Sequence, residues 1–511
     1  MIMFRKLLRY EWFWLSIVVF LGAFLRFWKI GEWQYFTYDQ ARDYLIVKKA
    51  VVDHKFTLVG PTVLAPGVYL PPFYYYSLIP FLLLFKFHLF GPDLYLAFLG
   101  TASIAVFYLL AKDFFGAKTA LLASAIFSLN PYLIQVSRHA WNPNTICFFT
   151  LLFALAFERY FRLKNNVYLV LAAFSLSWAL NLHYTVIVFL PLLFLLFYLE
   201  ARRHFLCKKL LFSAVIFLLF ISPIILFEFR HNFSNTNGVL TLLGSQKEKD
   251  LFLSKFESMI TDYFKMPLTL LAGVNQKENL TINPSHILLF DKTKILFDFK
   301  TFVTGAFLLV ALGVTAANIR KKSLELNLIL IFIVFGFLIR LIFPPGSFYF
   351  YHYTFFFPFV FLFVGYVLKK ILDFNLIVGV MIAVLLMFLP VFDLKIKNEI
   401  RKEEYFLAAC ETIAKESSDK KVALAANLLD ASRWDHNGLE YRYFLEAVFH
   451  LPLGGWEKSD YQTADVLYLI DEGDLEEPLR LGGMEMEAFG PKKIEKVWQA
   501  KTGQKIYKMT R

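Results

Sequence analysis

The stretch EWFWLSIVVFLGAFLRFWKIGEWQYFTYDQARDYL, residues 11 to 45, places a long apolar run before a segment with three charges in ten positions. The apolar run approaches the roughly 20 residues that an α-helix needs to cross a bilayer. The basic N-terminus resembles a signal peptide, but Arg26 and the sequence WKI stand where a cleavage site of small residues is expected. We therefore predict an uncleaved anchor helix, followed by a separate helix in the charged segment.

The rest of the chain shares this apolar character. Of 511 residues, 58% are hydrophobic and 18% are charged, and the mean hydropathy is +0.53, so the composition predicts a polytopic membrane protein with the lipid bilayer as its partner. The net charge of +12 does not indicate nucleic-acid binding, because the basic residues form short clusters between apolar segments. The three cysteines show no spacing typical of a disulfide framework or a metal site.

Twelve apolar windows are candidate membrane spans. They lie near 12–30, 73–90, 94–111, 119–136, 145–160, 166–182, 184–199, 210–227, 301–318, 324–342, 350–368 and 374–392. The six basic clusters fall together on the cytoplasmic side only if one window before residue 112 does not cross. Window 73–90 is interrupted by Pro80, carries Lys86 and His88, and opens with tyrosines typical of an interface. We predict about eleven crossings and one helix lying in the outer interface.

This topology places the N-terminus in the cytoplasm of a cell-membrane protein and exposes one set of loops outside. The outer segments are 31–93, 130–144, 181–185, 228 to about 300, 343–353 and the part after about 393. We predict an all-α membrane domain over residues 1–394 and a small extracytoplasmic α/β domain over residues 395–511. In the second domain, EEYFLAACETIAKESS predicts a helix, KVALAANL and ADVLYLI predict buried strands, and the end of the chain predicts a hairpin around Thr502 and Gly503.

The charged segment after the first span predicts a helix with an organised polar face. Thr37 is a natural N-cap, and Gln40 three residues later completes a capping box, so the helix should begin at Tyr38. Asp39, Arg42 and Asp43 then share one face through i,i+3 and i,i+4 spacing. A solvated surface helix would show the same pattern, but the position immediately outside the first span makes this face a candidate site.

Together these features resemble the C-type (GT-C) membrane glycosyltransferases, in the branch that includes bacterial aminoarabinose transferase and the protein O-mannosyltransferases. The resemblance covers residues 1 to about 395: the first span, the acidic start of the outer loop, the Pro-Pro-aromatic interfacial helix and the SR-x-A motif at residue 137. It implies sugar transfer from a polyprenyl-phosphate carrier, with Asp39 as catalytic base and Arg42 as a ligand of the carrier phosphate. The family commonly has Asp-Glu where this chain has Asp39 and Gln40, so the second carboxylate is missing.

The implied reaction needs a carboxylate to take the proton of the acceptor hydroxyl, and a cation to stabilise the departing phosphate. A single displacement with inversion follows, because no second carboxylate is required as an acid. We predict no cofactor and no metal, because Asp39 and Asp43 with Arg42 between them are more typical of an ion-pair cluster. Where some family members carry Glu-Lys before Pro-Pro, this chain has Tyr69 and Leu70.

The other outer loops supply candidate substrate-binding residues, in addition to Arg42 and Asp43. These are Arg138, His139, Arg230, His231, His352 and Tyr353. A cation near the membrane favours an anionic partner, although an interfacial arginine that reaches lipid headgroups would look the same. For His183 the structural interpretation, a hydrogen-bonded interfacial histidine, is favoured. We expect the Asp39 helix and these loops to share one outer cavity.

The main alternative is a transporter or flippase of a lipid-linked or small polar substrate. Transporters tend to show internal symmetry and polar groups near the bilayer midplane, and neither is apparent here. A non-catalytic member of the family, marked by Gln40, is a third possibility. The sequence does not encode the sugar, nor whether the acceptor is a protein, a lipid or a glycan.

Overall fold

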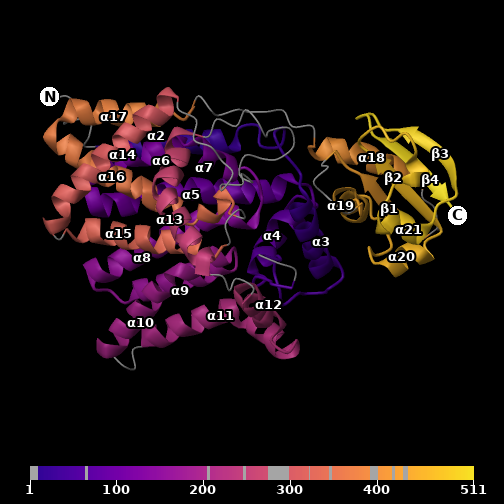
Figure 1. Ribbon diagram of the computed structural model, residues 1–511, viewed down its shortest axis with the longest axis horizontal. Helices are drawn as coiled ribbons and strands as arrows, with labels where there is room; N and C mark the ends of the chain where they lie inside the picture. The colour runs from indigo at the N-terminus through magenta and orange to yellow at the C-terminus, as the bar shows by residue number, and fades with distance from the viewer. Residues whose placement is uncertain are drawn as a thin grey trace. The chain divides into compact units, whose positions relative to one another are not determined.

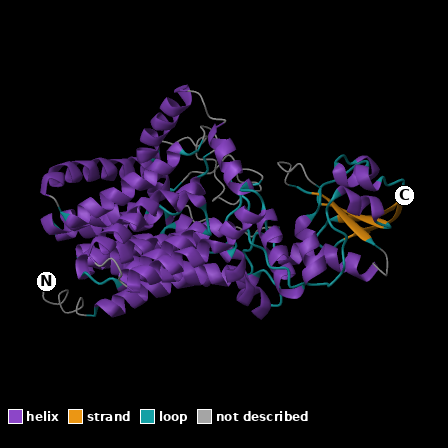
Figure 2. Cartoon of the chain, turned by 90° about the horizontal axis from the view of Figure 1, so that it is seen from below, coloured by secondary structure: helices purple, strands orange, loops and turns teal. Residues whose placement is uncertain are grey.

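The computed structural model describes residues 10–63, 67–203, 208–244, 249–273, 298–321, 323–343, 348–391, 401–416, 421–429 and 436–511. Helices dominate the described chain, and the strands of its one sheet all come from the C-terminal segment (Figure 1, Figure 2). The chain divides into two compact units. Unit 1 comprises Met1–Trp28, Thr57–Tyr76 and Asp93–Ile396, and unit 2 comprises Lys29–Phe56, Ser77–Pro92 and Lys397–Arg511.

Unit 1 is built from helices. Their bounds are α2 Glu11–Phe27, α6 Ala117–Leu129, α7 Pro131–Val136, η1 Asn142–Thr145, α8 Ile146–Leu163, α9 Val167–Leu180, η2 Tyr184–Phe189, α10 Leu190–Arg203, α11 Lys208–Arg230, α12 Ser234–Gly244, α13 Lys249–Ala272, α14 Phe299–Asn318, η5 Ile319–Lys321, α15 Leu324–Leu338, η6 Ile339–Leu341, η7 Phe350–Tyr353, α16 Phe357–Phe374 and α17 Leu376–Phe388. Two more helices, α4 Phe73–Leu84 and α5 Phe90–Phe115, have residues in both units.

Each of the twelve predicted windows lies largely on helix. Within the described ranges, five helices are long and apolar enough to cross a membrane: Phe90–Phe115, Tyr184–Arg203, Lys208–Arg230, Phe299–Asn318 and Leu324–Leu341. Helix α4 contains Pro80 and has 12 residues, or about 18 Å of helix against a hydrocarbon core of about 30 Å. The interfacial position of α4, the eleven crossings and the sidedness stay predictions.

The helix prediction was wrong in two places. The window 119–136 is two helices, because Asn130 caps α7 by accepting from the Leu133 N–H at 3.2 Å and Pro131 occupies the first helical position. The outer segment after residue 228 contains α12 and α13, which were not predicted as helices. In α13, Lys255, Asp262 and Thr269 lie on the buried face. Because these polar residues recur every seven positions, the sequence lacks the continuous apolar stripe by which a helix is predicted.

Glycines allow close helix packing in unit 1. A Cβ atom on Gly22 of α2 would lie 2.3 Å from Ser128 Oγ, and one on Gly100 of α5 would lie 2.2 Å from Ser137 Oγ. We expect Gly100→Ala to lower the melting temperature, because overpacking a close contact costs about 1–3 kcal/mol. Gly313→Ala in α14 is the matched control, since nothing lies within 4 Å of its Cβ. Equal melting temperatures for the two variants in the same detergent would contradict the packing.

Unit 2 contains the predicted α/β fold. Its elements are α3 Tyr38–Val52, α18 Glu403–Glu416, β1 Val422–Asn427, α19 Leu439–Ala447, α20 Lys458–Thr463, β2 Val466–Asp471, η9 Pro478–Arg480, α21 Met484–Phe489, β3 Lys493–Gln499 and β4 Lys505–Thr510. In the described residues the sheet order is β1-β2-β4-β3. Strands β1 and β2 are parallel, and the other pairs are antiparallel. The predicted helix, both buried strands and the terminal hairpin are confirmed.

Helix α3 begins where its capping chemistry predicts. It starts at Tyr38, and the backbone N–H of Thr37 donates to Gln40 Oε1 at 3.1 Å. The helix packs against α19, so the structure groups residues 29–56 with the C-terminal segment. The sequence did not indicate this association, because it joins segments almost 400 residues apart.

Candidate active site

Asp39, Arg42 and Asp43 form one ion-pair cluster on α3. Arg42 Nη1 lies 2.8 Å from Asp39 Oδ1, and Arg42 Nη2 lies 2.8 Å from Asp43 Oδ1. Arg42 Nε also donates to Asp43 Oδ1, at 2.9 Å. The side chain of Asp43 is 1% exposed and that of Asp39 is 38% exposed. Asp39 is therefore the more accessible of the two carboxylates, while the buried Asp43 holds the guanidinium of Arg42.

The cluster lies where the helix itself stabilises an anion. Asp39 is in the first turn of α3, and the partial positive charge of a helix N-terminus favours a carboxylate there. Arg42 is held by acids on both sides, so its planar guanidinium keeps one orientation. A group of three possible metal ligands among His, Cys, Asp and Glu does not occur in the described ranges. The prediction of metal-independent chemistry stays a prediction.

In unit 1, Arg138 binds the end of the first helix. Its Nη1 donates to the carbonyl oxygens of Leu25 at 2.9 Å and Arg26 at 3.0 Å, and cations are favoured at a helix C-terminus. Burial lowers the pKa of the Arg138 guanidinium to about 10, and the carboxylate of Asp93 acts in the opposite direction. Arg138 is thus cationic at pH 7. The neighbouring His139 is buried, and its carbonyl accepts from Asn144 Nδ2 at 2.9 Å.

Arg26 has a structural role that the sequence did not predict. Its side chain is buried, and Nε donates to Ser137 Oγ at 3.2 Å while Nη1 donates to the carbonyls of Gly22 and Ser128 at 3.0 Å. Ser137 and Arg138, adjacent in the SR motif, therefore both bind α2 or its end. The only sequence signal was an arginine within an apolar run, where a buried cation needs polar partners.

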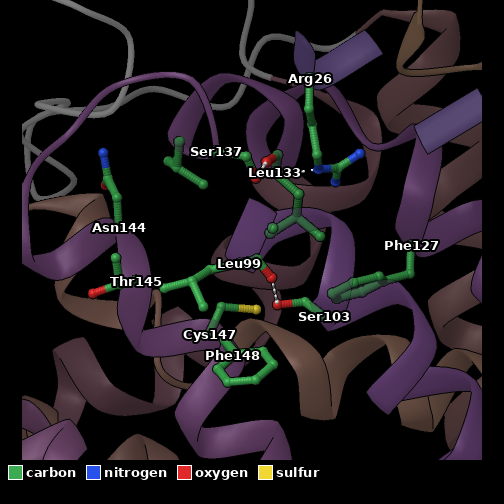
Figure 3. Close-up of a pocket in the computed structure, with 12 residues that line it drawn as sticks. Arg26, Leu99, Ser103, Phe127, Leu133, Ser137, Asn144, Thr145, Cys147 and Phe148 are labelled. Atoms are coloured by element: carbon green, nitrogen blue, oxygen red, sulfur yellow. Dashed lines mark hydrogen bonds between the residues drawn. The ribbon is translucent and has the colours of Figure 1, made fainter. Parts of the chain in front are cut away.

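Beside Arg26 lies a small cavity, lined also by Ser103, Ser137, Asn144 and Cys147 (Figure 3). The Ser103 hydroxyl donates to the carbonyl of Leu99 at 2.8 Å. The space open to the centre of a water molecule is about 10 Å³, which is room for about one water. A sugar ring does not fit in this space.

Two buried histidines meet at η7. The ring centroids of His183 and His352 are 5.5 Å apart, and His352 also stacks on Phe343 at 4.3 Å. The Nδ1 atom of each histidine accepts a backbone N–H at 3.2 Å, from Thr185 and from Tyr349 respectively. Acceptance at Nδ1 leaves the proton of the neutral ring on Nε2. The predicted hydrogen-bonded role of His183 is confirmed, and the structure brings His352 to it.

The burial of His183 has a consequence for pH dependence. Burial lowers the pKa of His183 from 6.5 to about 4, so between these values the unfolded chain binds a proton that the native protein does not. Stability should fall as the pH drops from about 6.5 to about 4, by up to about 3 kcal/mol. We expect His183→Gln to reduce the loss of melting temperature between pH 7 and pH 5. His54→Gln, at an exposed histidine, should behave like wild type, and an unchanged pH dependence in His183→Gln would contradict this assignment.

The remaining predicted residues lie in different settings. Tyr353 is buried, and its hydroxyl donates to Asp262 Oδ2 at 2.8 Å, while Asp262 pairs with Arg340 Nε at 3.2 Å. Arg230, the last residue of α11, and His231 are exposed. The His231 ring stacks on Phe227 at 4.1 Å. Asp39, Arg42 and Asp43 belong to unit 2, whereas the other six candidates belong to unit 1.

Part of the chain matches a protein-family model, and its structure resembles solved structures. Residues 70–227 match the family model of dolichyl-phosphate-mannose-protein mannosyltransferase. The structure resembles ArnT from Cupriavidus metallidurans bound to undecaprenyl phosphate, with a TM-score of 0.60 and 13% identity over 97% of this chain and 98% of that one. The chain has the GT-C fold. The predicted resemblance to the GT-C enzymes and the predicted fold class are both confirmed.

A second GT-C structure supports the same fold. The archaeal oligosaccharyltransferase AglB from Archaeoglobus fulgidus, in complex with an inhibitory peptide and a dolichol-phosphate, matches with a TM-score of 0.52 and 13% identity, over 90% of this chain and 69% of that one. No curated protein matches this chain in sequence. The family match includes Arg138 and His139 but begins after Asp39, so the role of Asp39 depends on position and geometry.

Proposed function

We propose that this GT-C protein is a membrane glycosyltransferase that moves a sugar from a polyprenyl-phosphate donor to an acceptor hydroxyl on the outer membrane face. The observation that carries the proposal is the Asp39–Arg42 pair. It presents a partly exposed carboxylate, with its arginine 2.8 Å away, in the first turn of the helix after the first apolar segment. The matched ArnT structure holds undecaprenyl phosphate and the AglB structure holds a dolichol-phosphate, which supports a lipid phosphate as the carrier.

In the proposed reaction, the acceptor oxygen attacks the anomeric carbon and the bond from that carbon to the phosphate oxygen breaks. Asp39 takes the hydroxyl proton, and the polyprenyl phosphate leaves with the electron pair. Arg42 stabilises the negative charge that grows on the phosphate. One displacement inverts the anomeric configuration. The proposed reaction needs no cofactor, because Asp39 takes the proton, the acceptor oxygen takes the sugar, and the polyprenyl phosphate leaves with the electron pair.

The other candidate residues form two groups, according to their contacts in the structure. We propose that Arg230 and His231, which are exposed, contact the donor or acceptor directly. Arg138, His139, His352 and Tyr353 already bind neighbouring groups, and we propose that they shape the substrate site of the membrane domain, residues 1–394. We propose that the domain of residues 395–511 and the loops that carry the candidate residues are extracytoplasmic. The N-terminus is proposed to be cytoplasmic.

The test is an assay of purified protein in nanodiscs with a panel of polyprenyl-phosphate sugars and candidate acceptors. The expected result is release of free polyprenyl phosphate with at least one donor, in equal amount to the glycosylated acceptor. Nuclear magnetic resonance of that product should show the inverted anomeric configuration. Retention of the anomeric configuration would contradict a single displacement. Absence of free polyprenyl phosphate with every donor would contradict the proposed activity.

A further inference from the structure

The start of helix α3 is attached to the C-terminal α/β domain, residues 401–511, by a backbone hydrogen bond. The N–H of Phe36 donates to the carbonyl of Arg401 at 2.9 Å. The next residue is the N-cap Thr37, and Asp39 follows two residues later. Any displacement of Arg401 would therefore move the first turn of α3, which carries the proposed base.

Arg401 is itself fixed by two acids of the C-terminal domain. Its guanidinium pairs with Glu472, directly after β2, and with Glu440 of α19 at 3.4 Å. The three side chains are at most 7% exposed, and buried charge pairs with matched hydrogen bonds hold one geometry. The guanidinium also lies 5.0 Å from the ring centre of Phe406 in α18. Arg401 thus connects the end of β2, α18 and α19 to Phe36, the residue before the cap of α3.

A cluster of aromatic rings holds the buried face of α3. The ring of Phe36, 1% exposed, lies 5.3 to 5.5 Å from the rings of Phe406, Tyr443 and Phe444. Tyr443 also lies 5.6 Å from Tyr44, and its hydroxyl donates to the carbonyl of Phe87. Pairs at these distances add specific geometry to apolar burial. Tyr443 therefore contacts both the segment before the cap and the second turn of α3.

The charged groups at the far end of α3 make longer contacts. Lys49 Nζ lies 4.5 Å over the ring of Trp456, and Lys48 Nζ is 4.0 Å from Glu446. These groups are partly exposed, and such pairs contribute little. The end of α3 that carries Asp39 is therefore the end with the backbone hydrogen bond to Arg401 and the buried Arg401 ion pairs.

From this arrangement we infer that the C-terminal α/β domain positions the proposed base, with Tyr443 as the principal positioning residue. The inference rests on the proposed function for its catalytic consequence. The domain holds the N-terminal turn of α3 through Phe36, Arg401 and Tyr443, so that Asp39 keeps its orientation toward the acceptor. A displacement of about 1 Å in such a group lowers a rate by about 10²-fold.

The test compares Tyr443→Ala with Tyr461→Ala. Tyr461 is also fully buried in the same domain, and its hydroxyl also donates to a backbone carbonyl, that of Leu424 at 3.0 Å, but it packs in the core formed with the sheet and α21. We expect Tyr443→Ala to lower kcat by about 10- to 100-fold with the KM for the donor unchanged. Tyr443→Phe should restore most of the activity, and Tyr461→Ala should keep the kcat of wild type per folded molecule.

Hydrogen exchange provides a readout that does not need activity. The amides of residues 41–45 should exchange faster in Tyr443→Ala than in wild type, and at the wild-type rate in Tyr461→Ala. If Tyr443→Ala does not fold, Phe36→Leu takes its place with the same expectations. Unchanged exchange and kcat in the variant that folds would overturn the inference. An inactive wild type with the expected exchange pattern would instead refute the proposed function and leave the attachment of α3 intact.

Discussion

Replacing Asp39 by Asn is expected to lower turnover by about 10²- to 10⁴-fold, the usual contribution of a general base. The amide keeps the size of the side chain and one oxygen that can accept from Arg42, but it cannot take the proton of the acceptor hydroxyl. Binding of polyprenyl phosphate should remain, because Asp39 contributes no attraction to an anion. Two quantities are measured for the variant and for wild type: the rate of lipid phosphate release, and the dissociation constant for the sugar-free carrier.

Asp53→Asn is the matched control for this change. Asp53 is the C-cap of the same helix, its side chain is 36% exposed, and it lies 3.9 Å from Lys48. Removing its charge should leave turnover within about twofold of wild type, because a surface pair of this kind is worth at most about 1 kcal/mol and does not touch the proposed reaction. Turnover of Asp39→Asn at the level of Asp53→Asn would exclude Asp39 as the base.

Replacing Arg42 by Gln should produce two separable losses. The first is stability, because the buried carboxylate of Asp43 loses its cation, and breaking such a pair costs about 3–5 kcal/mol. The second is turnover, by about 10²- to 10³-fold, because a cation no longer stabilises the leaving phosphate. The melting temperature and the turnover per folded molecule are measured on the same samples.

The double variant Arg42→Gln with Asp43→Asn separates the two losses. It removes both members of the buried pair, so most of the melting temperature should return while turnover stays low. Arg42→Lys should recover little, because an ammonium group cannot bind Asp39 and Asp43 in the same planar arrangement. Recovery of turnover together with stability in the double variant would assign Arg42 a purely structural role.

Local chemistry made parts of this protein predictable. The start of α3 follows from Thr37 and Gln40, since a capping box acts within four residues. The buried strands β1 and β2 follow from short apolar runs between polar segments, and the hairpin follows from a Gly-containing turn. In each case the determining residues are neighbours in the chain.

Features made by distant residues were not predictable. Arg26 finds its partners Ser128 and Ser137 more than 100 residues away, and Phe36 finds Tyr443 across the length of the chain. The different exposure of the two acids of α3 was unpredictable for the same reason. Their spacing places Asp39 and Asp43 on one face, but only the packed structure exposes the first and buries the second.

The most direct measurement of the central claim uses proteoliposomes that carry a labelled polyprenyl-phosphate sugar in both leaflets. A glycosyltransferase breaks the bond between the sugar and the phosphate, whereas a flippase moves the intact donor between leaflets. We expect the label to appear on an acceptor, with one free polyprenyl phosphate for each sugar transferred, and we expect Asp39→Asn to abolish both. Movement of chemically intact donor across the bilayer, without release of lipid phosphate, would contradict this expectation.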